Sequence, residues 1–239
     1  PAVTTRQTEV LALTDALADP KARLLGARQP DRVALERRLA ALPTTTGPTA
    51  TALARERTVL VADTVYATAR KVETMRDLGA AGCKLLALDV CDEASITAAV
   101  ATVAAEQGAV GVLINNAGYG SEGPIEEVPM TEVRRQFETN VFGLTMLTKL
   151  VLPGMRKQGW GKIVNLSSMG GRMTLPGGGF YHATKYAVEA ISDALRFEVQ
   201  GFGIDVIIIE PGPIKTEFGD TAIARVAALG GPTSPYKEF

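Results

Sequence analysis

The sequence has a single histidine, His182, and only two cysteines, Cys83 and Cys91, among its 239 residues. One imidazole excludes sites built from several histidines, and it permits Ser-His-Asp or Cys-His catalysis only if every group converges on that ring. Two cysteines are too few for a four-ligand zinc site, so no metal site is predicted. We expect both cysteines to stay free thiols, as in a reducing compartment.

Long apolar runs and an excess of charge of one sign are also missing. No apolar stretch approaches the roughly 20 residues of a membrane-spanning helix, and no basic-then-apolar leader opens the chain. Lys and Arg number 25 against 26 Asp and Glu, which argues against a surface for nucleic acid. With 46% hydrophobic and 21% charged residues, the composition is that of a globular protein. We therefore expect a cytoplasmic protein with no membrane span and no nucleic-acid partner.

Aromatic residues are absent from the first part of the chain. All 13 lie at or beyond Tyr66, and residues 1–57 also lack isoleucine. The basic residues of this stretch are eight arginines and one lysine, whereas the two types are equally common afterwards. We predict an atypical, irregular helical segment over 1–57 and a second domain over 58–239. A shifted reading frame is an alternative origin of the first segment.

From residue 58 onward, short apolar runs rich in β-branched residues alternate with helical patterns. The expected strands are 58–61, 65–69, 84–90, 110–114, 162–167 and 205–210, and the expected helices are 72–81, 92–107, 131–157 and 181–200. Several strands are apolar throughout rather than alternating, which is typical of parallel strands buried on both faces. This order predicts an α/β fold with a doubly wound, mostly parallel sheet of the Rossmann type, flanked by helices.

Small and polar residues follow several of the predicted strands. In an open parallel sheet the carboxyl ends of the strands meet at one edge, and ligands bind in the crevice outside that edge. The residues at these ends are Arg70, Asp89, Val90, Asn115, Asn116, Ala117, Gly118, Ser167, Ser168, Pro211 and Gly212. The sequence therefore predicts a ligand site along this edge.

Tyr181 and Lys185 open the last long helix four residues apart, so they share one face of it. A free tyrosine has a pKa of about 10 and is a poor base at neutral pH. A nearby ammonium is expected to lower the pKa of Tyr181, which makes the phenol a usable acid and base. Ser168 is expected to donate a hydrogen bond to a substrate oxygen that gains negative charge. An ordinary solvated helix face is the alternative interpretation of the Tyr–Lys pair.

Several of these segments together resemble the short-chain dehydrogenase/reductase family. The resemblance rests on Asn115 to Gly118, on Asn140 and on residues 211–216. It also rests on the segment Tyr181-His-Ala-Thr-Lys185 and on Ser168, which precedes Tyr181 by 13 residues. It covers residues 58–239, and the tail is similar to the branch with retinol- and steroid-dehydrogenase-like members. The resemblance implies an oxidoreductase that interconverts an alcohol and a carbonyl compound with a nicotinamide cofactor, as a homodimer or homotetramer.

The resemblance also implies a role for each matching residue. Tyr181 is the implied general acid of carbonyl reduction, and Lys185 lowers its pKa and holds the nicotinamide ribose. Ser168 polarises the carbonyl group, and Asn140 holds a water molecule that links Lys185 to solvent. The other cofactor-binding residues that it implies are Asp89, Val90, Asn115, Asn116, Ala117, Gly118, Pro211, Gly212, Ile214 and Thr216.

The end of the second predicted strand distinguishes two cofactors. A carboxylate at this position accepts a hydrogen bond from the 2′-hydroxyl of NAD. Here Ala69 is followed by Arg70 and Lys71, and two cations suit the 2′-phosphate of NADP. We therefore predict NADP rather than NAD, with Arg70 at the phosphate. The alternative is that Arg70 is only a solvated residue at a helix start.

A glycine-rich pyrophosphate loop, with which members of this family begin, is missing from the sequence. Only Ala62 and Asp63 separate the first predicted strand from the extended run that starts at Thr64, whereas a parallel crossover needs about a dozen residues. The match to G-x-G-x-x-G at Gly118–Gly123 is followed by Pro124, with a helix expected only near Thr131, so we interpret it as a connection. The alternative function is therefore a catalytically impaired protein that acts as an interaction or regulatory module.

Overall fold

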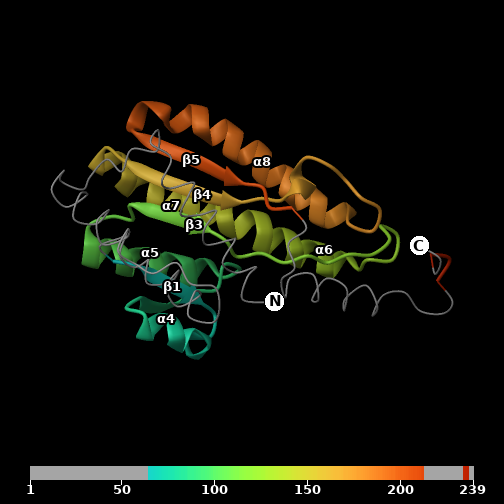
Figure 1. Ribbon diagram of the computed structural model, residues 1–239, viewed down its shortest axis with the longest axis horizontal. Helices are drawn as coiled ribbons and strands as arrows, with labels where there is room; N and C mark the ends of the chain where they lie inside the picture. The colour runs from blue at the N-terminus through green and yellow to red at the C-terminus, as the bar shows by residue number, and fades with distance from the viewer. Residues whose placement is uncertain (1–63, 213–233, 237–239) are drawn as a thin grey trace, which may run out of the picture. The chain divides into compact units, whose positions relative to one another are not determined.

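A computed structural model describes residues 64–212 and 234–236 of the chain (Figure 1). The chain divides into two compact units, of which the first ends at Leu88 and the second begins at Asp89. The domain boundary predicted at residues 57 and 58 and the first predicted strand lie outside the described residues, and both stay predictions.

The first unit contains a two-stranded parallel sheet and its connection. Strands β1 (Tyr66–Ala69) and β2 (Lys84–Ala87) pair with Tyr66 opposite Lys84. A 3-10 helix (Val72–Met75) and α4 (Arg76–Ala80) form the crossover that a parallel pair requires. These elements fall where the alternating pattern predicted a strand, a helix and a strand.

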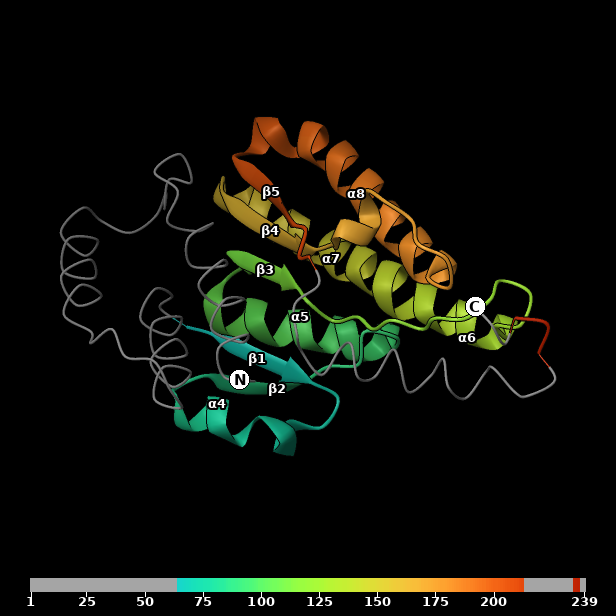
Figure 2. The ribbon, with the colours of Figure 1, turned by 45° about the vertical axis from the view of Figure 1, so that its right-hand side comes forward.

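The second unit contains a three-stranded parallel sheet in the order β3-β4-β5 (Figure 2). The strands are β3 (Val112–Asn115), β4 (Gly161–Leu166) and β5 (Ile204–Ile209). The helices are α5 (Glu93–Gln107), α6 (Met130–Phe137), α7 (Gly143–Gln158) and α8 (Gly179–Val199). The predicted α/β class with parallel strands and flanking helices is confirmed.

The hydrophobic core of the second unit lies between its sheet and helices α7 and α8. Its members are Val151, Met155, Ile163, Leu195, Val199, Ile204 and Val206. Met155 and Ile163 are completely buried, and burying a side chain of this size contributes roughly 1.5–3 kcal/mol. The packing of α7 and α8 on the sheet holds the carboxyl ends of β4 and β5 in place.

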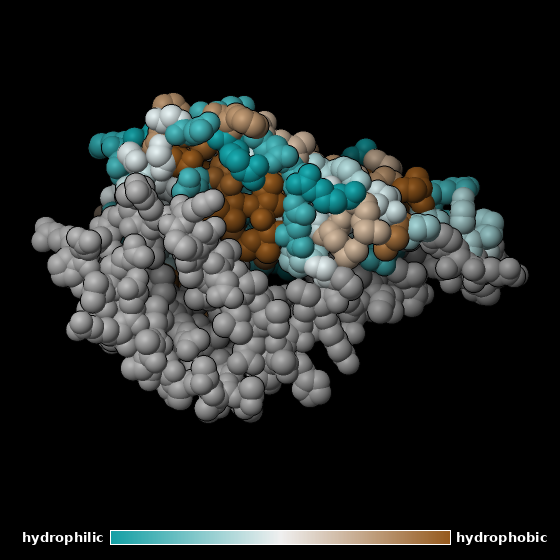
Figure 3. All heavy atoms as spheres, turned by 45° about the horizontal axis from the view of Figure 1, so that its top comes forward, coloured by the Kyte–Doolittle hydropathy of each residue, from teal (hydrophilic) through white to brown (hydrophobic). Residues whose placement is uncertain are grey.

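Strand β3 presents different faces to the core and to the surface. Leu113 packs against the core, and its neighbours Val112 and Ile114 point to the opposite face because side chains alternate along a strand. Val112 and Ile114 are 42% and 40% exposed, although an apolar run predicts burial on both faces. Figure 3 shows a patch of hydrophobic side chains at the surface, bordered by hydrophilic ones.

A π-helical turn interrupts the helix that the periodicity predicts over 131–157. Helix α6 ends at Phe137, the π-helical turn covers Glu138–Phe142, and α7 begins at Gly143. Such turns occur frequently at functional sites. Asn140 lies inside this turn and is almost completely buried.

Gly143 allows the start of α7 to approach Val90 closely. A Cβ atom on residue 143 would overlap the carbonyl oxygen of Val90 and lie 2.8 Å from the Val90 Cβ. Because the obstacle includes backbone, we expect Gly143→Ala to lower the free energy of unfolding by about 2 kcal/mol, although alanine favours helices. Gly201→Ala is the control, since a Cβ there would contact nothing within 4 Å. Equal urea midpoints for the two variants would contradict this expectation.

Two further sequence expectations concern the cysteines and the helices. Cys83 and Cys91 form no disulfide, as expected for thiols. Among residues 64–212 and 234–236, none of the helices combines the length and apolarity needed to cross a bilayer.

Candidate active site

The end of β4 and the start of α8 bring Ser168, Tyr181 and Lys185 together. Ser168 begins a 3-10 turn (Met169–Gly171), and its Oγ accepts a hydrogen bond from the Gly170 amide at 3.0 Å. Tyr181 lies in the first turn of α8, and its side chain is hydrogen-bonded to that of Ser168. The Nζ atom of Lys185 lies 5.8 Å from the centre of the Tyr181 ring. The three residues that the sequence analysis identified as candidates for catalysis therefore lie close together.

Lys185 carries a buried ammonium group. Its Nζ donates a hydrogen bond to the carbonyl oxygen of Leu166 at 2.8 Å, and the residue is only 7% exposed. Burial lowers the pKa of Lys185 to about 8, and the nearby carboxylate of Glu189 opposes this effect. Because an amine is protonated below its pKa, Lys185 is mostly charged at pH 7 and loses its proton as the pH rises through 8.

The expected lowering of the Tyr181 pKa is wrong for this arrangement. Burial is the main effect and raises the pKa of Tyr181, the hydrogen bond with Ser168 lowers it, and the Glu122 carboxylate raises it further. The ammonium of Lys185 lies over the phenol ring and donates to Leu166. Desolvation of the phenolate therefore outweighs its stabilisation, and Tyr181 is held as a neutral phenol.

The side-chain amide of Asn140 is engaged by the protein. Its Oδ1 accepts from the Tyr119 amide at 3.0 Å, and its Nδ2 donates to the Tyr119 carbonyl at 2.9 Å and to Thr184 Oγ1 at 3.1 Å. A Cβ on Gly118 would lie 3.2 Å from Asn140 Oδ1 and 3.9 Å from Lys185 Nζ. Asn140 thus fixes the loop after β3 beside Lys185, and its predicted contact with a water molecule stays a prediction.

Asn115 differs from its neighbours at the end of β3, because its side chain points into the interior. Its Nδ2 donates to Asn165 Oδ1 at 2.8 Å and to Thr148 Oγ1 at 3.3 Å, and Asn165 Nδ2 donates to Ser192 Oγ at 2.8 Å. These bonds join α7, β3, β4 and α8, so a cofactor contact of residue 115 would use its backbone. Thr148, Asn165 and Ser192 were not identified from the sequence as members of this network. The available signal was that each is a polar residue within a largely apolar strand or helix.

The remaining predicted residues of the loop after β3 and of the end of β5 are accessible. Asn116, Ala117 and Gly118 continue from β3 as an exposed loop. The Pro211 carbonyl accepts a hydrogen bond at 3.0 Å from the amide that follows Ser168, which ties the end of β5 to that turn. A Cβ on Gly212 would meet nothing within 4 Å.

The other predicted cofactor residues are distributed over the chain. Asp89 and Val90 begin the second unit, and Asp89 Oδ1 accepts a hydrogen bond from the Cys91 amide at 2.9 Å. Arg70 is an exposed residue of the first unit, directly after β1. Ile214 and Thr216 lie outside the described residues, so their predicted roles stay predictions.

The segment Gly118–Gly123 is a connection, as its sequence context indicates. Helix α6 begins only at Met130, after Pro129, so no helix N-terminus directly follows the glycines. The Gly123 amide instead donates a hydrogen bond to the Gly177 carbonyl at 2.7 Å. The loop after β3 is thereby joined to the loop that precedes α8.

His182, to which the sequence assigned no role, packs beside the Ser168 turn. Its Nδ1 lies 3.0 Å from the Gly170 carbonyl oxygen, and the residue is 8% exposed. A Cβ on Gly170 would overlap the imidazole, and one on Gly178 would lie 2.5 Å from Nε2. The two glycines make room for this ring, which holds the Ser168 turn against the start of α8.

Comparison with known proteins identifies the family of this chain. Residues 48–226 match the short chain dehydrogenase family. The chain belongs to this family, which confirms the resemblance seen in its motifs. It is 41% identical over 183 residues to an uncharacterized oxidoreductase, YusZ, of Bacillus subtilis, with 73% of this chain and 65% of YusZ aligned.

Two further relatives are named as reductases. The chain is 42% identical to a 3-ketodihydrosphingosine reductase of Bacteroides thetaiotaomicron, over 73% of this chain and 62% of that protein. It is 45% identical to an NADPH-dependent 3-dehydrocapnine reductase of Ornithobacterium rhinotracheale, over 64% of this chain and 54% of that protein. The chain thus spans between about half and two thirds of the length of these relatives.

Solved structures share the fold of this chain. A short-chain dehydrogenase from Streptomyces avermitilis is 44% identical, with a TM-score of 0.66 over 70% of this chain and 63% of that one. A gluconate 5-dehydrogenase from Burkholderia cenocepacia, in complex with NADP and tartrate, is 25% identical. Its TM-score is 0.65, over 77% of this chain and 73% of that one. These likenesses confirm the Rossmann-type fold.

Proposed function

We propose that this protein is an NADP(H)-dependent oxidoreductase that interconverts an alcohol and a carbonyl compound. The observation that carries the proposal is the meeting of Ser168, Tyr181 and Lys185 at the end of β4 and the start of α8. A neutral phenol hydrogen-bonded to a serine is suited to donate a proton to an oxygen atom. The family membership supports the same reaction class.

The proposed reduction assigns one task to each side chain. Tyr181 donates its hydroxyl proton to the carbonyl oxygen as negative charge develops there, and Ser168 donates a hydrogen bond to the same oxygen. Lys185, charged at neutral pH, stabilises the phenolate that remains. In alcohol oxidation Tyr181 takes the proton back. The nicotinamide, when bound, supplies or accepts the hydride.

The second unit offers residues that fit a nicotinamide dinucleotide. Gly118 has no side chain beside Asn140 and Lys185, and Gly212 faces open space, so backbone is accessible at both positions. Lys185 would hold the nicotinamide ribose, and Asn115 to Gly118 would line the adenine-ribose side. Pro211 and Gly212 would hold the nicotinamide carboxamide and the phosphates. Asp89 and Val90 would lie at the adenine, and Ile214 and Thr216 complete the proposed set.

NADP is the proposed cofactor, with Arg70 at its 2′-phosphate. One solved relative is described in complex with NADP, and one reductase among the relatives is named as NADPH-dependent. We expect NADPH to bind at least tenfold more tightly than NADH, and Arg70→Ala to weaken NADPH binding about tenfold while NADH binding stays unchanged. Fluorescence titration measures both constants. Equal weakening of both cofactors would contradict the assignment of Arg70.

Turnover tests the reaction itself. We expect the protein to consume NADPH in the presence of a ketone, and 3-ketodihydrosphingosine is a rational first substrate because it is named for a relative. The absorbance of NADPH reports the rate. Saturable NADPH binding without turnover of any ketone or alcohol in a broad panel would refute the proposal that the protein is an enzyme. Absence of NADPH binding would favour the interaction or regulatory module instead.

A further inference from the structure

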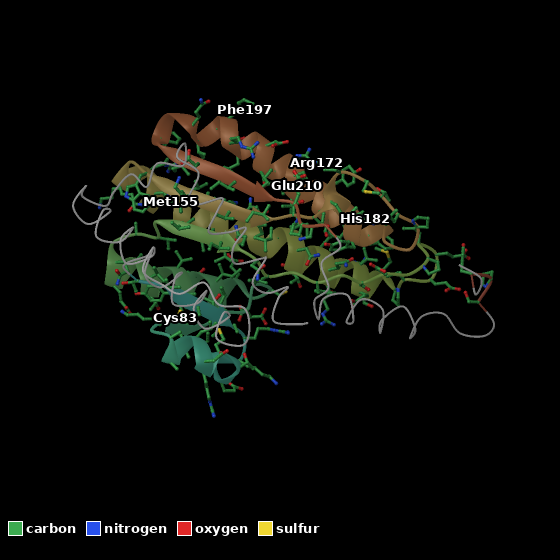
Figure 4. The ribbon with its side chains drawn as sticks, in the orientation of Figure 1. Cys83, Met155, Arg172, His182, Phe197 and Glu210 are labelled. Atoms are coloured by element: carbon green, nitrogen blue, oxygen red, sulfur yellow. The ribbon has the colours of Figure 1, made fainter. Side chains whose placement is uncertain are left out.

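Arg172 connects three parts of the second unit that surround the candidate active site. Its Nη2 lies 2.9 Å from Glu189 Oε2 and 2.9 Å from Glu210 Oε1, and its Nε donates to the same Glu210 oxygen at 3.1 Å. Arg172 ends the turn that starts at Ser168, Glu189 lies on α8 one turn after Lys185, and Glu210 directly follows β5. Figure 4 shows Arg172 and Glu210 close together.

Glu189 is the buried member of this group. Its side chain is 5% exposed, compared with 54% for Arg172 and 37% for Glu210. The Ser168 turn covers it, because a Cβ on Gly171 would lie 2.9 Å from Glu189 Cγ and 3.1 Å from its Oε1. A carboxylate is buried in ionised form only where a cation pairs with it. The ion pair with Arg172 supplies that cation from the surface.

Glu189 lies on the same helix as the active-site lysine, one turn further along α8. Lys185 and Glu189 are four residues apart on α8 and therefore share a face. Burial lowers the pKa of Lys185, and Glu189 acts in the opposite direction. Other charged or titratable groups act on the members of this cluster: the Glu122 carboxylate acts on Tyr181, and the carboxylates of Asp193 on α8 and of Glu210 after β5 act on Arg172. Strand β4 contributes the uncharged Leu166 carbonyl.

We propose that Arg172 and Glu189 are positioning residues of the active site. Arg172 holds the side chain of Glu189 under the Ser168 turn, and the charge of Glu189 keeps the buried Lys185 protonated. This inference rests on the proposed function, because Lys185 must be charged to stabilise the Tyr181 phenolate. The same ion pairs attach the Ser168 turn to α8 and to the end of β5, so the serine and the lysine keep their relative positions.

The protonation of Lys185 tests this proposal independently of turnover. Trace labelling of the whole protein with acetic anhydride at a series of pH values, followed by mass spectrometry of the Lys185 peptide, gives its titration midpoint. We expect Glu189→Gln to lower this midpoint by about one pH unit, because a stabilising negative charge is lost. Arg172→Met is expected to lower it in the same direction, since the ion pair that holds the Glu189 side chain in place is lost. Arg172→Lys should restore part of the shift.

Glu210→Gln is the matched control, because it removes the exposed partner of Arg172 and leaves the pair with Glu189 intact. Its midpoint is expected to equal that of the parent protein, and the double variant Arg172→Met/Glu189→Gln should shift no further than Glu189→Gln alone. A merely structural role would lower the melting temperature without moving the midpoint. An unchanged midpoint in folded Glu189→Gln overturns the proposal. If that variant does not fold, an unchanged midpoint in Arg172→Met overturns it.

Enzyme kinetics separate this inference from the proposed function. In Glu189→Gln the alkaline limb of kcat is expected to move to lower pH by the same amount as the labelling midpoint, while KM for the carbonyl substrate changes less than twofold. If the parent protein turns over no substrate, the proposed function fails, and the labelling result still decides whether Arg172 and Glu189 control Lys185.

Discussion

Tyr181→Phe is expected to reduce carbonyl reduction by about 10³-fold or more, because it removes the proposed proton donor and leaves the ring in place. The loss should fall on kcat, since the phenylalanine ring still fills the same space beside Ser168 and Lys185. NADPH affinity is expected to change less than threefold, because the proposed cofactor contacts of Lys185 and the Gly118 loop remain. Steady-state kinetics and fluorescence titration of the same preparation measure both quantities.

Tyr186→Phe is the matched control for this prediction. Tyr186 lies on the same helix, is 45% exposed, and belongs to no part of the proposed site. We expect its kcat to stay within twofold of the parent value. A Tyr181→Phe variant that keeps its fold by circular dichroism and turns over at the parent rate would remove Tyr181 from the mechanism.

Replacement of Lys185 by methionine is expected to have the second-largest effect. The variant loses the only ammonium that lies over the Tyr181 ring among the described residues, and it loses the hydrogen bond to the Leu166 carbonyl. We expect kcat to fall about 10²-fold, with weaker NADPH binding because the proposed ribose contact is lost. Both changes should appear together, in contrast to Tyr181→Phe.

The pKa of Lys185 also predicts the direction in which the reaction rate changes with pH. Because burial lowers the pKa of Lys185 to about 8, carbonyl reduction by the parent enzyme should decline as the pH rises through 8. Lys185→Arg should move this decline to higher pH, since a guanidinium keeps its proton. Lys149→Met, which changes an exposed residue of α7, should leave the profile unaltered. An alkaline limb that is identical in the parent protein and Lys185→Arg would assign the decline to another group.

Most elements of the described chain were predictable because each has a local signature. The strand before Arg70, the helix over 92–107 and the strand at 205–210 all occur within a few residues of their predicted bounds. The π-helical turn was not predicted, because one additional residue in a turn hardly alters the apolar spacing on either side of Asn140. The Tyr–Lys face of α8 was predictable because i and i+4 positions coincide on any helix.

The electrostatics of the site were not predictable in the same way. A tyrosine and a lysine one turn apart suggested a lowered tyrosine pKa, whereas burial dominates and raises it. The direction of the Lys185 ammonium depends on Leu166, which lies on another element. The role of Asn115 likewise depends on Asn165, 50 residues away in the chain.

The sequence by itself determined the order of strands and helices, the family, and the residue types at the carboxyl ends of the strands. These features arise from neighbours along the chain, whose spacing sets the side-chain period and the turn chemistry. Only the tertiary structure decided which polar side chains face the site and which are buried, and it placed Arg172 between Glu189 and Glu210. Burial and charge pairing arise from residues that folding brings together, so the pKa of each site residue depends on the packed structure.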